Sequence, residues 1–551
     1  MASERQGPFD RILKRTDDSG PARADRVVIY VGGTIIGLAI LLLVLVLPPI
    51  SILSGGGGSD IPVTPGDADE YTSTVRGNMP DPPDGLEAAS AMFELSAPAD
   101  QRGASGITVP LKDSATDARG LGLYTYTGES WARLSDVTLV ANGSAARGEV
   151  DALPGNVAVL RRVEAVFGIA GLLPAGTELD PAIAGALTVL HPLVFLPTAD
   201  GSLVGGPVTS EPSSYNIVPS VIAPSAEVVD EILRSSDLRV QHAARIAEAV
   251  AAGNYAGIHL DYRAVNVTLR EQYTDFVQVL ADALHEDSRT LTLTLPLPIG
   301  ENGDIDEGAY DWAALGAAAD AIEIAPELDQ EIYFSRTERA LDYAVDRVDA
   351  SKLWLTIPSL STERGTDGYR SLSFGEAMAV ASVVAIRAED GVAAGAQVPL
   401  VAQNLSQAEG ASGMRWDDAA RTVAFDYPGL GGQRTVWIAN RFSSAFRLEL
   451  ALRYELGGVV LTDVSTAAGA ADAAAPLRDY VDSGSYELAT PNSDLFTPAW
   501  TASAGTLSGT TGDTVTWTAP SDGGPADLTL IISDGVARIG QRVPVDVRPA
   551  E

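Results

Sequence analysis

Three polar side chains alternate along one short segment of this chain, and their types could support acid–base chemistry or the binding of an anion. His259, Asp261 and Arg263 occupy every second position near the end of the run Tyr255 to Arg263. Alternate residues of a β-strand share one face, so a strand here presents all three side chains together. Histidine changes charge near neutral pH, whereas the arginine guanidinium stays charged and cannot serve as a general acid. The segment therefore predicts a polar site that contains at most one acidic group.

Strands and helices alternate around this segment. Amphipathic helical patterns, Leu238 to Ala252 and Leu269 to His285, lie on either side of it. The alternation runs from Glu164 to about Val481, which favours a parallel sheet closed into a barrel. The expected strands are residues 165–172, 190–196, 215–223, 257–262, 290–296, 321–325, 352–358 and 458–463. Arg263 then falls at the carboxyl end of the fourth strand, where barrel enzymes place their sites.

The segment resembles the fourth barrel strand of glycoside hydrolase family 18, the chitinase-like enzymes. That family carries a D-G-x-D-x-D-x-E motif there, and its final glutamate donates a proton. At the matching positions this chain has Ala256, His259, Asp261 and Arg263, so only the third acidic position is kept. Other phrases follow the family's order, namely Asp311 to Asp320, Lys352 to Ser359, Trp416 to Asp418, Val436 to Ile438 and Tyr454 to Val459. The resemblance implies a (β/α)8 TIM barrel over residues 163–483.

The same resemblance implies a glycosidase that uses the substrate's acetamido group, and three departures from the family pattern argue against that activity. Arg263 removes the acid. At the end of the sixth strand, where the family has a Met-x-Tyr-Asp phrase, this chain has Ile324 to Asp329, so the tyrosine that steadies the acetamido group is missing. The eighth strand ends in Leu461-Thr462-Asp463, where the family usually has a tryptophan beneath the sugar. We therefore expect a degenerate barrel with no catalytic residue at the family positions.

Three interpretations of this site remain open. The favoured one is a buried polar cluster in which Arg263 pairs with Asp261, because an unpaired buried charge is costly. In the second, Arg263 is a fork for a carboxylate, sulfate or phosphate of an anionic glycan. In the third, an acid on the sixth strand works against Asp261, since suitably spaced carboxylates can hydrolyse glycosides. The candidate ligand-binding residues are Asp261, Arg263, Glu323, Glu327, Asp329 and Asp463.

The N-terminal region predicts a membrane anchor. Val27 to Leu47 is an uncharged apolar run of about the 20 residues that span a bilayer, and the segment before it is basic. The positive-inside rule then places the N-terminus in the cytoplasm and the bulk of the chain outside. No small-residue cleavage site follows Pro49, which favours an uncleaved single-pass anchor over a signal peptide. The expected order is a cytoplasmic tail (1–26), a transmembrane anchor (27–50), a flexible stalk (51–85), a small β-sandwich (86–162), the barrel (163–483) and an immunoglobulin-like β-domain (484–551).

The two flanking β-units offer fewer chemical signals. Short strand-like runs punctuated by glycine predict the sandwich of residues 86–162. Its Tyr124, Tyr126 and Trp131 could form an aromatic platform for a sugar, although packing inside the sandwich is the favoured interpretation. At the C-terminus, Pro498 to Gly505 and Val515 to Pro520 resemble bacterial immunoglobulin-like modules, which commonly serve as spacers or adhesive surfaces.

Composition excludes several classes of function. The formal net charge of −36 argues against nucleic-acid binding, which needs a basic surface. The chain has no cysteine and its four histidines are scattered, so we expect no disulfide, zinc site or other cofactor. The sequence predicts a membrane-anchored, extracytoplasmic protein whose barrel binds glycan or acts as a scaffold for an envelope protein. The alternative is a divergent glycosidase acting on cell-wall or surface polysaccharide.

Overall fold

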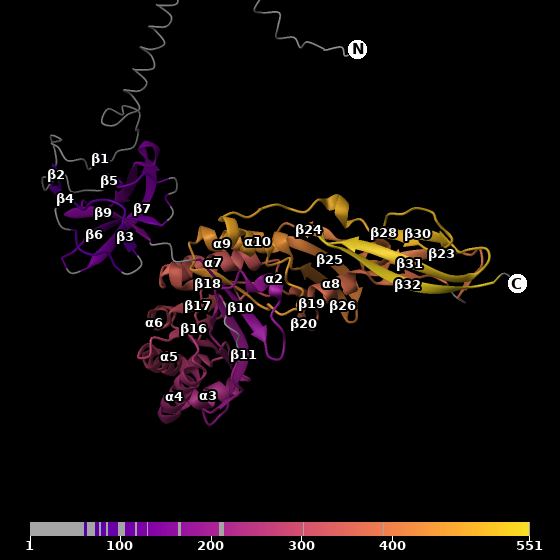
Figure 1. Cartoon of the computed structure of the whole chain (residues 1–551), viewed down its shortest axis with the longest axis horizontal. Coiled ribbons are helices and arrows are strands. Elements are labelled where there is room, and N and C mark those ends of the chain that lie inside the picture. The colour runs from indigo at the N-terminus through magenta and orange to yellow at the C-terminus, as the bar shows by residue number, and fades with distance from the viewer. Residues whose placement is uncertain are drawn as a thin grey trace, which may run out of the picture. The chain divides into compact units, whose positions relative to one another are not determined.

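The computed structural model describes residues 60–62, 72–76, 79–83, 86–96, 105–115, 118, 120–128, 130–162, 167–208, 214–300, 302–388 and 391–549. These residues form two compact units, one within residues 1–163 and the other within 164–551 (Figure 1). The predicted cytoplasmic tail (1–26) and transmembrane anchor (27–50) lie outside the described residues. No helix in the described ranges is both long and apolar enough to cross a membrane.

The described part of the first unit consists mainly of β-strands. Eight of its nine described strands form one hydrogen-bonded path in the order β1-β5-β8-β7-β6-β9-β4-β2, and the ninth, β3, pairs with β9. The strands are β1 (Asp60–Pro62), β2 (Thr72–Val75), β3 (Leu86–Ala88), β4 (Phe93–Ser96), β5 (Ser105–Pro110), β6 (Leu121–Tyr126), β7 (Trp131–Val140), β8 (Ala145–Val150) and β9 (Asn156–Arg162). Alternate apolar residues such as Ile107, Leu123 and Val159 meet in one buried core. Two of these strands, β1 and β2, fall inside the predicted stalk, so part of that segment adds to the sheet.

The aromatic residues singled out in this unit pack against a second, smaller apolar cluster. Tyr124, Tyr126 and Trp131 lie beside the fully buried Met92. The rings of Tyr126 and Trp131 meet edge to face with their centroids 5.5 Å apart. The indole of Trp131 donates a hydrogen bond of 3.0 Å to the carbonyl of Asp81. These contacts support the packing interpretation of the three side chains over the sugar platform.

The second unit contains a closed parallel barrel, as the alternation of strands and helices predicts. Its eight strands are β10 (Gly168–Pro174), β11 (Val189–Pro197), β14 (Ser220–Ile222), β15 (Gly257–Asp261), β16 (Thr290–Leu295), β17 (Ala321–Ile324), β18 (Leu353–Ile357) and β27 (Gly458–Leu461). Pairing of β10 with β27, from Gly168↔Gly458 to Gly171↔Leu461, closes the ring. The short strands β12 (Leu203–Val204) and β13 (Asn216–Ile217) pair with β11.

Helices cover the outside of the barrel because each carries an apolar face. They are α2 (Pro181–Ala184), α3 (Ala226–Arg234), α4 (Ser236–Gly253), α5 (Arg270–His285), α6 (Trp312–Ala318), α7 (Tyr333–Val345), α9 (Arg441–Arg453) and α10 (Ala475–Ser483). On α5, Tyr273, Phe276, Leu280 and Leu284 recur at helical spacing and are buried. They join the outward-facing strand residues in one continuous core.

A tryptophan fills the amino-terminal end of the barrel lumen. Trp354 on β18 lies over Gly168 on β10 and Gly458 on β27. The two glycines are paired with each other, and Gly458 is also paired with Trp354. A Cβ atom at Gly168 would lie 2.0 Å from Cη2 of the indole, and one at Gly458 would lie 2.8 Å from its Cδ2. The two glycines therefore make the space that the indole occupies.

The chain between β18 and β27 forms a five-stranded antiparallel sheet, which we call the insertion sheet. Its strands are β19 (Ser361–Gly365), β20 (Gly368–Leu372), β24 (Arg415–Asp417), β25 (Thr422–Gly429) and β26 (Gly432–Ile438), in the order β20-β19-β26-β25-β24. Helix α8 (Phe374–Ala381) follows β20 and begins with a capping box between Ser373 and Glu376. The segments 416–418 and 436–438, which resemble a family insertion, contribute to this sheet.

Two further four-stranded sheets form a sandwich that extends from the insertion sheet (Figure 1). One contains β21 (Val384–Ile386), β23 (Gln397–Ala402), β29 (Thr506–Leu507) and β30 (Thr514–Thr518). The other contains β22 (Val392–Ala393), β28 (Ala499–Ala502), β31 (Gly524–Ser533) and β32 (Arg538–Arg548). Trp500, Trp517 and Leu528 are buried between them. Segments before and after residue 484 thus build this sandwich together.

Replacing Gly168 with alanine is expected to destabilise the barrel by about 1–3 kcal/mol, because the new methyl group overlaps the Trp354 indole. Gly185→Ala is the matched control, since Gly185 has a φ of −69° and a Cβ there meets no atom within 4 Å. Urea unfolding of both variants measures the difference. Equal midpoints for the two variants would contradict the packing described for Trp354.

Candidate functional site

Alternate residues of the barrel strands point into its lumen and bring polar side chains together. On β15, Ile258 and Leu260 belong to the outer core, so His259 and Asp261 face inward. The pairing of β15 with β16, and of β16 with β17, sets Thr294 and Glu323 beside them. Glu323 and His259 are both at least 98% buried, so this part of the lumen is sealed from solvent.

Glu323 stands at the centre of this lumen network. Its Oε1 lies 2.9 Å from Nε2 of His191 on β11, and its Oε2 lies 3.3 Å from Nε2 of His259. His259 Nδ1 is 2.7 Å from the hydroxyl of Ser220, and its Nε2 is 2.6 Å from the hydroxyl of Thr294. The two imidazole rings lie close, with centroids 4.6 Å apart. Residues from four strands are therefore tied to one buried carboxylate.

The hydrogen bonds around His259 are complete when its ring is neutral. Burial lowers the pKa of His259 to about 4, although the neighbouring Glu323 carboxylate opposes that shift. The neutral ring accepts from the Ser220 hydroxyl and donates to Thr294, whose hydroxyl donates to Glu323 at 3.5 Å. In this chain of hydrogen bonds each group donates to the next, from Ser220 through His259 and Thr294 to Glu323.

Glu323 is held in its charged form by the same network. Burial would raise its pKa, but the electrostatic interactions with His259 and His191 and the hydrogen bonds from His191 and Thr294 outweigh burial, so its pKa lies below the ordinary value. His191 Nδ1 lies 2.8 Å from the carbonyl of Val218, so the ring is held between that carbonyl and the Glu323 carboxylate. A general acid needs a raised pKa and access to substrate. Glu323 has neither.

Sequence reasoning did not identify His191, Ser220 or Thr294 as partners of this network. His191 lies in an apolar run, and the sequence alone shows it as one of four scattered histidines. The available signal was strand alternation, because two of the four histidines lie on predicted barrel strands at inward positions. The distance between them depends on the pairing of β11, β14 and β15, which periodicity does not give.

Asp261 and Arg263 meet at the carboxyl end of β15, as the favoured interpretation predicts. Arg263 Nε and Nη2 donate to the two carboxylate oxygens of Asp261 at 2.6 and 2.8 Å, which is the bidentate geometry of a strong pair. The expected burial of the whole cluster is wrong for one member, because the Arg263 side chain is 51% exposed and that of Asp261 only 9%. The strand has ended at Asp261, and the chain turns outward there.

The tyrosines beneath this pair fix the loop that carries Arg263. The hydroxyl of Tyr310 donates to the carbonyl of Tyr262 at 2.9 Å and accepts from the backbone N–H of Val265 at 3.3 Å. Burial raises the pKa of Tyr310 to about 12, so its phenol stays protonated at neutral pH. Arg263 is thus presented by a loop that is held at both of its ends.

The carboxylates after β17 are each held by a different arginine. Glu327 accepts from Arg336 at 3.1 Å. Asp329 accepts from Arg364 at 3.3 Å and from the hydroxyl of Tyr369 at 3.0 Å, both on the insertion sheet. These contacts connect the barrel mouth to the insertion sheet. They direct both carboxylates towards arginine donors and not towards Asp261.

Asp463 and Ala256 also have structural surroundings. Asp463 Oδ1 accepts from the backbone N–H of Ser465, and its own N–H donates to the Ser359 hydroxyl, each at 2.8 Å. It therefore closes the turn after β27 and ties it to the end of β18. Ala256 precedes β15, and its N–H donates to the carbonyl of Ile217, so it lies at the opposite end of the strand from Arg263. Across the described ranges, no three His, Asp or Glu side chains are grouped to hold a metal ion.

No family model matches this chain. Two curated proteins of Bacillus subtilis (strain 168) resemble parts of it. "Putative sporulation-specific glycosylase YdhD" is 22% identical over 142 residues, which cover 24% of this chain and 34% of that protein. "Uncharacterized glycosylase YvbX" is 24% identical over 115 residues, which cover 19% of this chain and 33% of that protein. The chain thus spans about a third of the length of these curated relatives.

Solved structures similar to this chain include chitinases and a spore cortex-lytic enzyme. A chitinase from Chromobacterium violaceum has a TM-score of 0.43 and 22% identity, and the match covers 56% of this chain and 98% of that one. The spore cortex-lytic enzyme SleL of Bacillus megaterium has a TM-score of 0.42 and 17% identity, with 57% and 74% covered. A GH18 chitinase from Cycas revoluta has a TM-score of 0.43 and 14% identity, with 57% and 98% covered.

The lumen network predicts a specific dependence of stability on pH. The pKa of His259 is about 4 in the folded chain and 6.5 when unperturbed, so the unfolded state binds more protons between these values. Stability is therefore lost as the pH falls from 6.5 towards 4, by about 1 kcal/mol per pH unit from this residue. The lowered pKa of Glu323 adds a further loss below its ordinary value of 4.5. Urea unfolding at several pH values measures the slope.

Two variants show whether His259 causes that slope. His259→Asn is expected to flatten it above the range in which carboxylates titrate. His285→Gln is the control, because His285 is 44% exposed and lies outside the lumen. An unchanged slope in His259→Asn would contradict the protonation state assigned to the network.

The half-exposed position of Arg263 sets the cost of removing it. Arg263→Ala is expected to lower the free energy of unfolding by about 1–3 kcal/mol, because it leaves the Asp261 carboxylate without its two donors where water can reach it. A fully buried pair would cost about 3–5 kcal/mol. A double-mutant cycle with Asp261→Ala isolates the pairing energy. Additive single and double variants would show that the two side chains do not interact.

Proposed function

We propose that this chain is a non-hydrolytic, glycan-binding protein of the cell envelope, with a barrel like that of glycoside hydrolase family 18. One observation carries the proposal. At the end of β15, where the resemblance implies a proton-donating glutamate, Arg263 donates two hydrogen bonds to Asp261. Arginine cannot donate a proton to a leaving group at neutral pH. The Asp261–Arg263 pair therefore stands where the family resemblance implies the proton donor, and it offers groups that can bind a ligand but cannot protonate one.

The surroundings of the remaining carboxylates support the absence of turnover. Glu323 is sealed in the lumen with a lowered pKa. Glu327 and Asp329 accept from arginines of α7 and the insertion sheet, and Asp463 accepts from a turn. A divergent glycosidase needs one accessible carboxyl that keeps its proton and a second one across the scissile bond. None of these four side chains has surroundings that favour that role.

A glycan is the favoured ligand of the barrel mouth. The two curated relatives are named as glycosylases, and the phrases of this chain that resemble family 18 follow the family's order. Arg263 is 51% exposed and paired on one side only, so its outer face can bind a sugar hydroxyl or an acidic group. Binding without cleavage then replaces hydrolysis.

The placement of this activity is part of the proposal. An N-terminal anchor within residues 27–50 would hold the barrel outside the cytoplasmic membrane. The β-unit before the barrel and the sandwich after it, which the sequence likens to an immunoglobulin-like module, would serve as spacers or contacts for an envelope protein. The same mouth would then act as a scaffold that recognises wall or surface glycan.

The purified full-length chain is expected to bind chitotetraose or cell-wall glycan without cleaving it. Product analysis after long incubation measures turnover, and equilibrium titration measures binding. Arg263→Ala should weaken binding by about tenfold, which corresponds to the loss of one charge-assisted contact. Arg538→Ala is the control, because Arg538 is exposed at the start of β32, away from the barrel. Cleavage that disappears in Asp261→Ala would contradict the proposal.

A further inference from the structure

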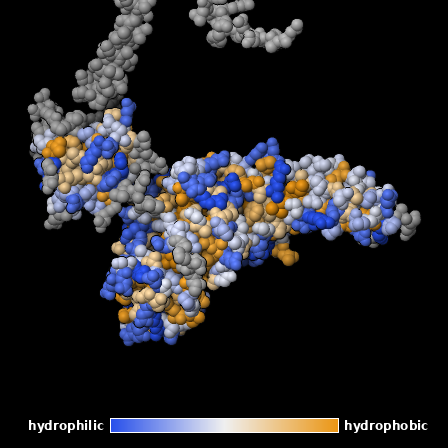
Figure 2. Space-filling model, in the orientation of Figure 1, coloured by the Kyte–Doolittle hydropathy of each residue, from blue (hydrophilic) through white to orange (hydrophobic). Residues whose placement is uncertain are grey.

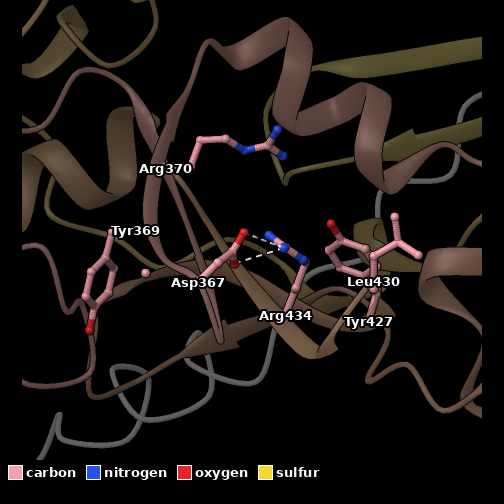
Figure 3. Close-up of a pocket in the computed structure, with 8 residues that line it drawn as sticks. Asp367, Tyr369, Arg370, Tyr427, Leu430 and Arg434 are labelled. Atoms are coloured by element: carbon pink, nitrogen blue, oxygen red, sulfur yellow. Dashed lines mark hydrogen bonds and ion pairs between the residues drawn. The ribbon is translucent and has the colours of Figure 1, made fainter.

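A pocket of about 380 Å³ lies on the insertion sheet, between the turn that joins β19 to β20 and the turn that joins β25 to β26. Its polar walls are Asp367, Arg370 and Arg434, and its apolar walls are Tyr427 and Leu430 (Figure 3). A volume of this size is enough for a small organic ligand. Leu430 is 94% exposed at the tip of its turn. Figure 2 shows a hydrophobic protrusion on the lower edge of the region where Figure 1 labels β19, β20 and β26.

This pocket lies on the face of the sheet that does not contact the barrel mouth. Glu363 on β19 is paired with Arg370 on β20 and Val436 on β26, so these residues share one face. Arg364, the next residue, points to the other face and binds Asp329 of the barrel. In Figure 3 the Tyr369 ring points away from the other side chains. The pocket is therefore separate from the site at Arg263.

A buried carboxylate, that of Glu363, holds three of the side chains that line the pocket. Glu363 is fully buried. Its Oε1 accepts from the Tyr427 hydroxyl at 2.6 Å, and its Oε2 accepts from Arg434 Nη1 at 3.0 Å. Arg370 Nη2 lies 2.7 Å from the same Oε2. Burial and the bond to Glu363 raise the pKa of Tyr427 to about 12, so it remains a donor. Two guanidinium groups thus converge on one negative charge.

Asp367 neutralises the second guanidinium from the solvent side. Arg434 Nη2 donates to both of its carboxylate oxygens, at 2.9 and 3.0 Å (Figure 3). The Asp367 side chain is 69% exposed and stands in the turn between β19 and β20, so water can reach it. Gly429 makes room for Arg434, because a Cβ there would lie 2.6 Å from its Cδ. The Asp367 carboxylate therefore occupies a site in which the Arg434 guanidinium is already oriented to bind a carboxylate.

Arg370 adds unused donors beside that position. Its side chain is 59% exposed, and its Nη2 makes an ion pair with Glu363. Figure 3 shows its guanidinium reaching over the Asp367–Arg434 pair. With Asp367 in place, the charges of Glu363, Asp367, Arg370 and Arg434 cancel. When Asp367 turns out to solvent, the site carries one positive charge and a planar fork of donors.

We propose that this pocket binds an acidic sugar, whose carboxylate replaces Asp367 against Arg434 and Arg370. The carboxylate follows from the occupant already present, since Asp367 shows that a planar carboxylate fits the fork. Leu430 and the Tyr427 ring offer an apolar wall to the sugar ring, as aromatic and aliphatic groups do in carbohydrate sites. The choice of a sugar body rests on the proposed glycan-binding function, whereas the choice of a carboxylate does not.

Titration of the full-length chain with D-glucuronate tests this proposal, with D-glucose as the ligand that lacks only the carboxylate. D-Glucuronate is expected to bind, and D-glucose is not. Asp367→Asn should tighten the binding of D-glucuronate by about tenfold, because the internal competitor loses its charge. Arg370→Gln should weaken it by about tenfold or more. Because the Arg370 side chain is half-exposed, an unchanged melting temperature is expected to show that this variant is folded.

Each alternative outcome overturns a stated part of the proposal. A carboxylate site is ruled out if Asp367→Asn binds D-glucuronate more weakly than the parent chain does. It is also ruled out if neither the parent chain nor Asp367→Asn binds D-glucuronate. Equal binding of acetate rules out the sugar body, and tighter binding of inorganic phosphate rules out carboxylate as the preferred anion. Arg263→Ala should leave D-glucuronate binding at this pocket unchanged while it weakens chitotetraose binding. Failure of the pocket and failure of the barrel proposal are thereby distinguished.

Discussion

The ion pair between Asp261 and Arg263 is the interaction on which the functional account depends. It occupies the carboxyl end of β15 with a bidentate contact at 2.6 and 2.8 Å, in the place where the family resemblance implies a proton donor. The pair cannot release a proton at neutral pH, and it leaves one half-exposed guanidinium at the mouth. The proposed function, binding without hydrolysis, rests on this exchange of a proton donor for an ion pair.

The rest of the lumen is consistent with a structural role. Trp354 fills its amino-terminal end over two glycines, and above it Glu323 lies 2.9 Å from His191 on β11 and accepts a hydrogen bond from Thr294 on β16. Buried charges are stable only when their partners are in place, so this network favours a single arrangement of the strands. The carboxylates outside the lumen bind arginines that connect the barrel to the insertion sheet. Glu327 and Asp329 thus contribute to the contacts that hold the barrel mouth together.

Periodicity in the sequence was sufficient to predict the barrel. Strand–helix alternation predicted the eight strands, and alternation within 257–262 predicted that His259 and Asp261 share a face. It could not predict that Glu323 contacts His191 and His259, because these contacts depend on the relative heights of strands far apart in the sequence. Nor could it show that Arg263 is half-exposed, since the end of β15 is set by the loop that Tyr310 holds. The pairing of β23 with β30 crosses more than a hundred residues, and local patterns do not reveal it.

A crystal structure of the chain with chitotetraose tests the central claim most directly. The account predicts an intact oligosaccharide at the barrel mouth, with Arg263 still bound to Asp261 and its outer nitrogen atoms within about 3 Å of the sugar. Cleaved sugar, or a glycosidic oxygen within hydrogen-bonding distance of Glu327 or Asp329, would contradict it. Either result would show a working acid at the barrel mouth, which this account excludes.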